Sequence, residues 1–236
     1  MPVRLYRLPG SHYAERAEAL LHLKGVDYER VTLGYRDVLR RLPRETGHDR
    51  VPVVRWEDGR VSGWREVGAE LEARHPDPPL YPADAAARRE VAWWEDLADL
   101  ALGHAARRLG YWEMRERPDL RRRFFRARGP LGDLRSRALL AYFMRAYGVT
   151  AWNREDDGAL VARLMERVAE ALEAGDGAHL VARRLTAADV AVATLAFPIA
   201  ATPAAARLGP TRAWEWVRAT RARLRPPRRA AAPPAA

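Results

Sequence analysis

The pattern of apolar and polar positions changes near residue 80, from short alternating runs to long helical stripes. Residues 3–7 alternate in the way that suits a half-buried strand. Residues 14–24 then place their apolar side chains on one helical face, and Gly25 is a typical residue to end such a helix. A second strand is predicted from about residue 27 to residue 33. The chain therefore opens with a β-α-β order.

The rest of the first third predicts a mixed segment, a hairpin and a short helix. Residues 35–49 lack a clear period, and Pro43 interrupts any long helix there. Residues 50–56 form an apolar run that contains a proline, which weakens a strand because it cannot donate to the ladder. Asp58-Gly59 supplies a positive-φ turn position, so a hairpin follows. Residues 67–75 then show helical spacing.

A proline-rich stretch, residues 77–82, marks the best candidate boundary between two domains. Beyond it the strand signal disappears and helical patterns dominate. We expect an α/β domain over residues 1–76, a linker over 77–84, and an all-helical domain over 85–224. Residues 225–236 have too little apolar content to pack, which predicts a disordered tail. The predicted helices of the second domain cover residues 84–116, 135–147, 159–174, 187–200 and 211–224.

Cysteine is absent, which excludes disulfides, cysteine–zinc sites and a cysteine nucleophile. The absence suits a reducing compartment. No stretch has the length and apolar character of a membrane span, and the first residues lack an apolar signal core. The six histidines are scattered without paired spacing, so no metal site is predicted. We therefore expect a soluble, cytoplasmic protein that binds no metal.

The net charge of +10 raises the possibility of a nucleic-acid partner. Lys24 is the only lysine, however, so nearly all of the positive charge is arginine. These arginines alternate with acidic residues along predicted helices, which is typical of solvated helix faces. Residues 121–123 form the one dense internal cluster. The pattern favours solvated surfaces over a nucleic-acid interface.

Six segments, taken in order, resemble those of the cytosolic glutathione S-transferase superfamily. The resemblance spans nearly the whole chain, to about Leu224. It implies a thioredoxin-like N-terminal domain, an all-helical C-terminal domain, a cytoplasmic homodimer, and conjugation of glutathione to a hydrophobic electrophile in detoxification. Because the chain has no cysteine, it disfavours the thiol-reductase branches of this superfamily. The segments are residues 5–14, 23–29, 51–53, 72–76, 79–84 and 185–191.

Thr186 and Asp189 stand three residues apart before an apolar run. Each side chain can satisfy a free backbone N–H near the other residue, as in a capping box with Asp in place of Glu. Such a cap contributes about 1 kcal/mol. This motif predicts the start of a helix and carries no chemistry.

Ser11 is the candidate catalytic residue. It precedes a predicted helix, whose N-terminus stabilises an anion or a thiolate. Residues 11–14 resemble the catalytic loop of superfamily members that carry Cys-Pro-Tyr-Ala, which implies that Ser11 activates the thiol of glutathione. Ser11 could equally serve only as the helix cap. Tyr6 and Tyr13 are alternative hydroxyls, and His12 is either a base near neutral pH or an exposed loop histidine without a role.

The resemblance places the glutathione site on two further segments. Val51 would pair with the cysteinyl part of glutathione, and Pro52 sits where the family keeps a cis-proline; a trans proline on an edge strand is the alternative. Family members usually carry Glu-Ser or Asp-Ser before the third helix, where this chain has Gly63-Trp64 or, shifted by one, Trp64-Arg65. Arg65 could bind a carboxylate bidentately, while Trp64 would crowd or stack on the ligand. Trp64 and Arg65 are therefore the candidates for the glutamyl end.

The electrophile would bind between the Ser11 loop and the first long helix of the second domain. We expect Tyr13, Trp93, Leu97 and His104 to line this pocket, because helical spacing brings the last three near one face. Much of such a stripe is usually core, and Trp94 is predicted to be buried. The unusual segment before the third helix favours an alternative function, a non-catalytic ligand-binding or protein-interaction module on the same fold.

Overall fold

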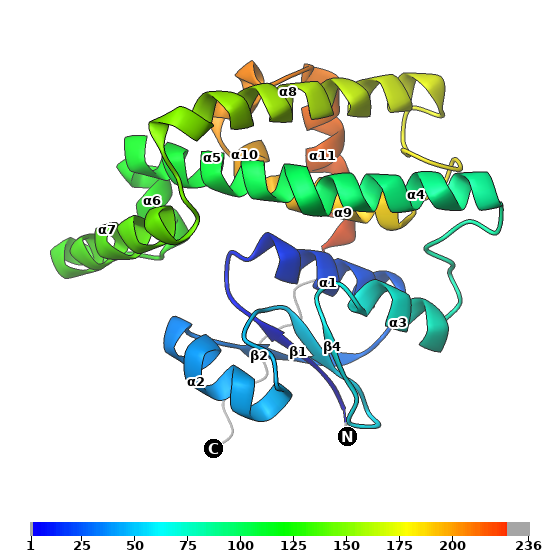
Figure 1. Ribbon diagram of the computed structural model, residues 1–236, viewed down its shortest axis with the longest axis horizontal. Helices are drawn as coiled ribbons and strands as arrows, with labels where there is room; N and C mark the ends of the chain where they lie inside the picture. Colours follow the sequence, from blue (N-terminus) through cyan, green and yellow to red (C-terminus); the bar gives the residue numbers. More distant parts are fainter. Residues whose placement is uncertain (1, 226–236) are drawn as a thin grey trace.

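The N-terminal part of the computed structural model, which describes residues 2–225, is a four-stranded mixed sheet with helices on both faces (Figure 1). The strand order is β2-β1-β3-β4, with β1 parallel to β2 and antiparallel to β3, and β3 antiparallel to β4. This arrangement confirms the predicted thioredoxin-like domain. Its elements are β1 (Val3–Arg7), α1 (His12–Leu23), β2 (Tyr28–Thr32), α2 (Tyr35–Thr46), β3 (Val53–Arg55), β4 (Val61–Gly63) and α3 (Val67–Arg74).

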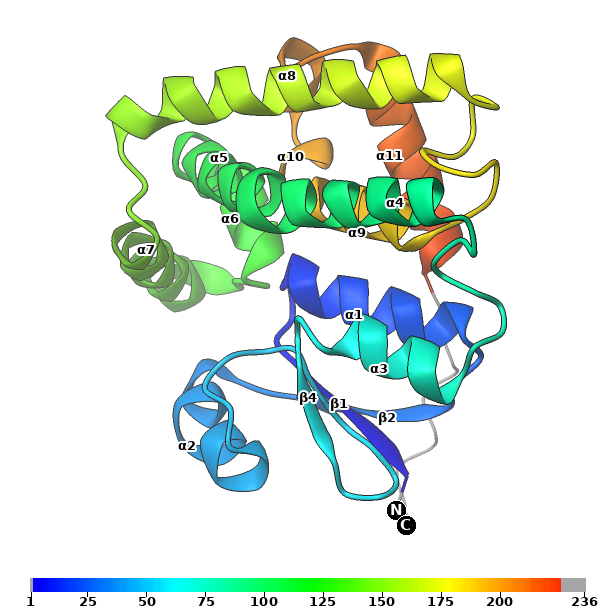
Figure 2. The ribbon, with the colours of Figure 1, turned by 45° about the vertical axis from the view of Figure 1, so that its right-hand side comes forward.

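Alternation along β1 divides its side chains between two hydrophobic clusters. Val3 and Leu5 are buried in the large core that includes α1, whereas Tyr6 packs with Leu42 of α2 in a smaller cluster. Successive strand residues point to opposite faces, so this is the expected outcome of a period of two. Helices α1 and α3 lie between the sheet and the helical part of the chain (Figure 2).

Helix α2 corrects the prediction of a mixed segment over residues 35–49, because it continues through Pro43. A proline inside a helix removes one backbone bond and costs about 3 kcal/mol. The carboxylate of Asp37 offsets part of this cost by accepting the N–H of Gly34 at 2.8 Å. Leu42, fully buried, anchors the helix on the sheet. Gly47, at φ 74°, ends the helix within the turn after Pro43.

The rest of the described chain is helical, as predicted, and a π-helical turn divides its first long helix. Helix α6 was not predicted, and α7 and α8 begin earlier than their apolar stripes indicate. The first turns of α8 are polar, and its start is marked by the reciprocal bonds between Thr150 and Asn153. The elements are α4 (Ala85–Leu97), the π-helical turn η1 (Ala98–Leu102), α5 (Gly103–Glu116), α6 (Pro118–Phe124), α7 (Gly129–Ala146), α8 (Ala151–Ala174), α9 (Ala187–Leu195), α10 (Phe197–Ala200), the 3-10 turn η2 (Pro203–Arg207) and α11 (Thr211–Leu224).

Helix α9 forms the centre of the core, and every one of its residues is buried. The predicted capping box is confirmed at its start: the carboxylate of Asp189 accepts the backbone N–H of Thr186 at 2.8 Å and its hydroxyl at 2.9 Å. The same carboxylate also accepts the N–H of Leu180 at 2.9 Å. A buried carboxylate is tolerated here because three donors satisfy it.

Ion pairs join the sheet part to the helical part across α1. Arg16 of α1 donates to Glu95 of α4 and to Asp99 of η1, each at 2.5 Å. Residues 75–84, which include the predicted linker, contain neither helix nor strand. The predicted disordered tail, apart from residue 225, lies outside the described residues. Among the described helices, none has both the length and the apolar character that crossing a bilayer requires.

Candidate functional site

Three loops that carry predicted glutathione-binding residues leave the same end of the sheet. Tyr6, near the end of β1, pairs with Val53 at the start of β3, and Val53 pairs with Gly63 at the end of β4. The loop after β1, the segment that leads into β3 and the turn after β4 therefore lie at the same end of the sheet (Figure 2). In this way the topology gathers residues that are far apart in the sequence, namely Ser11, Val51, Pro52, Trp64 and Arg65.

Ser11 is the N-cap of α1. Its Oγ accepts the backbone N–H of Ala14 at 3.2 Å, and its carbonyl accepts that of Glu15 at 3.0 Å. A serine hydroxyl also has one hydrogen of its own to donate. Ser11 can therefore cap the helix and donate to an anionic sulfur at the helix N-terminus, where the helix dipole adds stabilisation.

The peptide bond between Val51 and Pro52 is cis, as the resemblance implies. Within residues 2–225, neither the N–H nor the C=O of Val51 has a hydrogen-bond partner. A free donor and a free acceptor on one residue can pair with an extended peptide in the manner of an added strand. Val51 thus has the two groups that a peptide-like thiol requires.

The turn between β4 and α3 is occupied by the protein's own side chains. Trp64 is half-buried and packs edge-on against Tyr13, with 5.0 Å between the ring centroids. The exposed Arg65 lies over Trp64, its Cζ 4.7 Å from the ring centroid. Glu66 accepts the backbone N–H of Gly63 at 2.9 Å through Oε2. A carboxylate of the chain itself therefore lies at the start of α3, where the resemblance places the glutamyl end of glutathione.

The side chain of Tyr13 is buried between the two parts of the chain. Its hydroxyl donates to the carbonyl of Asp99 at 3.1 Å, and burial raises the pKa of this hydroxyl. Tyr13 therefore stays protonated and its hydrogen is engaged, which makes it a poorer activator of a thiol than Ser11. The ring of the exposed His104 lies 6.4 Å from that of Tyr13, centroid to centroid.

His12 is buried, with 4% of its surface exposed, so the interpretation as an exposed loop histidine is wrong. Its Nε2 lies 3.2 Å from the carbonyl oxygen of Gly103, which directly follows the π-helical turn η1. Because a carbonyl only accepts, Nε2 carries the hydrogen and Nδ1 keeps a lone pair. Burial, with Arg107 nearby, lowers the pKa of His12 well below its ordinary value. The imidazole is therefore a neutral acceptor.

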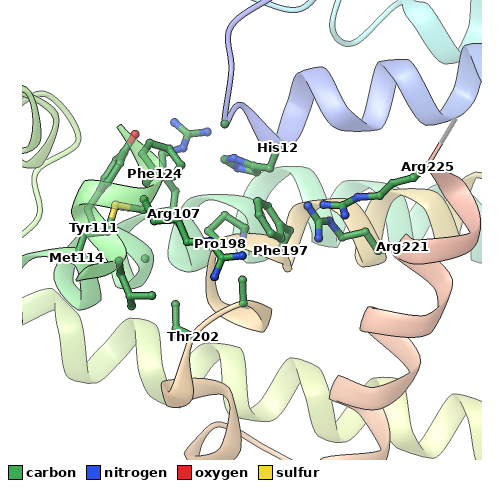
Figure 3. Close-up of a pocket in the computed structure, with 15 residues that line it drawn as sticks. His12, Arg107, Tyr111, Met114, Phe124, Phe197, Pro198, Thr202, Arg221 and Arg225 are labelled. Atoms are coloured by element: carbon green, nitrogen blue, oxygen red, sulfur yellow. The ribbon is translucent and has the colours of Figure 1, made fainter. Parts of the chain in front are cut away.

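A cavity of about 400 Å³ lies between the β1–α1 loop and helices α5, α6, α10 and α11 (Figure 3). Gly10 and His12, the two neighbours of Ser11, line it, and Figure 3 shows His12 between Phe124 and Phe197. Its size is within the range of small-molecule sites. Its lining residues are Gly10, His12, Arg107, Gly110, Tyr111, Met114, Leu120, Arg123, Phe124, Phe197, Pro198, Ala201, Thr202, Arg221 and Arg225.

The residues predicted for the electrophile pocket lie elsewhere, since none of Tyr13, Trp93, Leu97 and His104 lines this cavity. Trp93 is 46% exposed and packs against Trp94, which is buried as predicted. Leu97 is half-buried against the core. Among residues 2–225 no three histidine, aspartate or glutamate side chains gather as metal ligands.

The cavity uses the next part of the helical stripe, beyond the residues predicted to line the electrophile pocket. Arg107, Gly110, Tyr111 and Met114 repeat at helical spacing along α5, beyond His104. The helical spacing can be read from the sequence, but the sequence does not tell which neighbouring elements this face of α5 meets. Phe124 was missed because α6 has no apolar period of its own.

Comparisons with known proteins agree with this fold. Residues 5–79 match the family model "Glutathione S-transferase, N-terminal domain". A glutathione S-transferase from Methylobacterium radiotolerans, solved in complex with glutathione sulfonate, is 24% identical, with 95% of this chain and 90% of that chain covered and a TM-score of 0.58.

Two further solved structures are alike over nearly their full length. The β-etherase from Sphingobium sp. strain SYK-6 is 18% identical, with 95% of both chains covered and a TM-score of 0.69. A glutathione S-transferase from Methylobacillus flagellatus with glutathione bound is 19% identical, with 94% of this chain and 93% of that chain covered and a TM-score of 0.65. No functionally curated protein matches the chain. At these identities the likeness shows a shared fold.

Proposed function

We propose that this chain, whose N-terminal domain is that of the glutathione S-transferases and whose fold is that of their superfamily, joins glutathione or a related thiol to an electrophile. One observation carries the proposal: the two neighbours of Ser11 line the 400 Å³ cavity. A sulfur held at Ser11 would therefore stand at the edge of a space large enough for a second substrate.

The proposed reaction is a nucleophilic substitution or addition by sulfur. The thiol loses its proton, and the hydroxyl of Ser11 and the N-terminus of α1 stabilise the resulting thiolate. The thiol proton passes to solvent, because the low pKa of the buried His12 makes its imidazole a poor base. The sulfur then donates its electron pair to the electrophilic carbon, and a C–S bond forms. In a substitution, the leaving group departs with the electrons of its bond.

Two further segments would hold the thiol. The N–H and C=O of Val51 would pair with the main chain of the cysteinyl residue. The exposed guanidinium of Arg65 would bind the glutamyl carboxylate, and Trp64 would pack beside it. The Methylobacterium and Methylobacillus structures, which share this fold, contain glutathione sulfonate and glutathione, respectively, which supports a peptide thiol as the ligand.

A second candidate function is ligand binding without conjugation. The bond between Glu66 and the N–H of Gly63 favours it, because it places a negative charge near the position where the glutamyl carboxylate would bind. Two neighbouring carboxylates repel each other, and this repulsion would weaken the binding of glutathione. The two functions therefore differ in whether glutathione binds at all.

Calorimetric titration of glutathione into the pure protein tests the proposal. We expect saturable binding below millimolar concentration, weakened by Arg65→Gln and strengthened by Glu66→Gln, which keeps the acceptor oxygen and removes the charge. Arg89→Gln, a change at an exposed position of α4, is the matched control and should leave binding unchanged. No saturable binding at millimolar glutathione, in the wild type and in Glu66→Gln alike, would remove the glutathione enzyme and leave the binding module.

Homodimeric assembly, a cytoplasmic location and a role in detoxification rest on the family resemblance and stay predictions. Light scattering coupled to size-exclusion chromatography would test the first of them. A mass twice that of the 236-residue chain is the expected result.

A further inference from the structure

Arginines dominate the charge around the 400 Å³ cavity. Four of its described lining residues are arginines, and none is an aspartate or a glutamate. His12, the other titratable nitrogen group there, is neutral because burial lowers its pKa. The four arginines are Arg107, Arg123, Arg221 and Arg225.

Two of these arginines share one carboxylate. Arg221 donates to both oxygens of Glu15, at 2.5 and 2.9 Å, and the Nε of Arg225 lies 3.9 Å from the same carboxylate. One negative charge therefore stands against two positive charges at this end of the cavity. Arg221 also stacks on the ring of Phe197, with its Cζ 3.4 Å from the centroid, so its position is fixed by two contacts.

The other two arginines have no carboxylate within 4.0 Å among residues 2–225. Arg107 is half-buried and lies between the rings of Tyr13 and Tyr147, its Cζ 5.3 and 4.4 Å from their centroids. Arg123 is exposed and follows Arg121 and Arg122, both of which are paired with Asp133. Arg107 and Arg123 thus keep free donors at a cavity that already has a surplus of positive charge.

The remaining wall is apolar and partly aromatic. Tyr111, Phe124 and Phe197 present rings, and Met114 and Leu120 add flexible apolar side chains. Flat apolar ligands pack well against such surfaces, and methionine adapts to irregular shapes. The cavity therefore combines an apolar wall with unpaired cationic donors.

We propose that this cavity takes an amphipathic organic anion, with a flat aromatic body against Phe124 and Phe197 and a carboxylate or sulfonate held by Arg107 and Arg123. This inference rests on the proposed function in one respect: it makes the electrophilic substrate an aromatic anion instead of a neutral hydrophobic compound. The exposed Arg123 attracts the anion at the mouth, and the half-buried Arg107 holds it. Guanidinium groups suit this task because they bind a carboxylate with two parallel hydrogen bonds.

A matched pair of probes, 2-naphthoate and 2-naphthamide, tests the proposal without glutathione. Both have the same ring system, and only the first is charged. Calorimetric titration into the full chain should show naphthoate binding about tenfold more tightly than naphthamide, since hydrogen bonds to charged groups are the stronger ones. Raising the salt concentration should weaken naphthoate binding and leave naphthamide binding nearly unchanged.

Variants of the arginines test whether Arg107 and Arg123 cause the preference for naphthoate. Arg107→Gln and Arg123→Gln should each weaken naphthoate binding several-fold, and together they should remove the preference over naphthamide. Arg218→Gln, at an exposed position of α11 that does not line the cavity, removes the same charge and should change neither affinity. Equal affinity for the two probes, binding of neither at millimolar concentration, or an unchanged preference in the double variant would overturn the proposal. Naphthoate binding without glutathione binding would overturn the proposed enzyme and keep this cavity as an anion site.

Discussion

Gly10 and Phe124 approach so closely that a side chain at position 10 has no room. A Cβ on Gly10 would stand 2.6 Å from Cζ of the Phe124 ring, and Gly10 has a φ of +81°. Gly10 belongs to the β1–α1 loop and Phe124 to α6, so the two parts of the chain meet at the residue that precedes Ser11. Phe124 of helix α6 therefore packs against the loop that carries Ser11, and both Gly10 and Phe124 line the cavity.

Gly10→Ala should destabilise the protein by about 2 kcal/mol, through the positive φ and the displaced ring. Gly25→Ala is the control, because Gly25 has a φ of +64° and nothing within 4 Å of its added Cβ. It should lose only about 1 kcal/mol, the cost of a left-handed conformation. Urea unfolding measures both variants. Equal losses would mean that Phe124 moves aside freely.

Ser11→Ala tests whether Ser11 only caps α1 or also stabilises the thiolate. Loss of the cap should reduce the free energy of unfolding by about 1 kcal/mol. Loss of a hydroxyl that stabilises the thiolate should reduce kcat/KM for conjugation by about a hundredfold, with little change in the Kd for glutathione. Ser11→Thr keeps the hydroxyl and should retain most of the activity. A fall in kcat/KM no larger than the fall in affinity would reduce Ser11 to a cap.

His12 should make stability depend on pH. Its pKa is lowered in the folded state, so below its ordinary value of about 6.5 the unfolded chain binds a proton that the folded chain does not. Stability is therefore complete above about pH 7 and falls as the pH decreases, by up to about 1.4 kcal/mol per pH unit from this group. Urea unfolding of the wild type and of His12→Asn between pH 5 and 8 measures the difference in slope. Identical slopes would show that His12 is protonated in the folded protein.

Arg16→Gln should be strongly destabilising. The change leaves Glu95 and Asp99 close together without their shared cation, and breaking a buried pair in this way costs about 3–5 kcal/mol. Burial already raises the pKa of Glu95, so we expect this carboxyl to take up a proton in the variant. Arg88→Gln, a more exposed position of α4, should change the free energy of unfolding by less than about 0.5 kcal/mol. A loss below 1 kcal/mol in Arg16→Gln would show that water replaces the arginine.

Local signals in the sequence were enough to predict most of the sheet domain and the Thr186 cap. Ser11, Val51 and Trp64 were placed by the resemblance to the superfamily, and their part in binding stays a prediction. Helix α2 could not be predicted, since the buried Leu42 outweighs the proline that follows it. The cavity could not be predicted either, because it depends on where α6 lies and on which way Arg107 faces. The burial of His12 could not be predicted, because its hydrogen-bond partner is the carbonyl of Gly103, and the π-helical turn before Gly103 has no recognisable sequence pattern.

That π-helical turn, residues 98–102, sets the phase between two surfaces on one long helix. It adds a residue to the turn, and one residue of an α-helix corresponds to a rotation of about 100°. Helix α4 thereby directs Glu95 to the sheet domain, while α5 directs Arg107 and Tyr111 into the cavity. Loss of a single residue in this turn would rotate the cavity wall out of register, while Glu95, which lies before the turn, would keep its pair with Arg16. An insertion or deletion here would therefore change the shape of the ligand site together with the contacts that Asp99 and Gly103 make with α1.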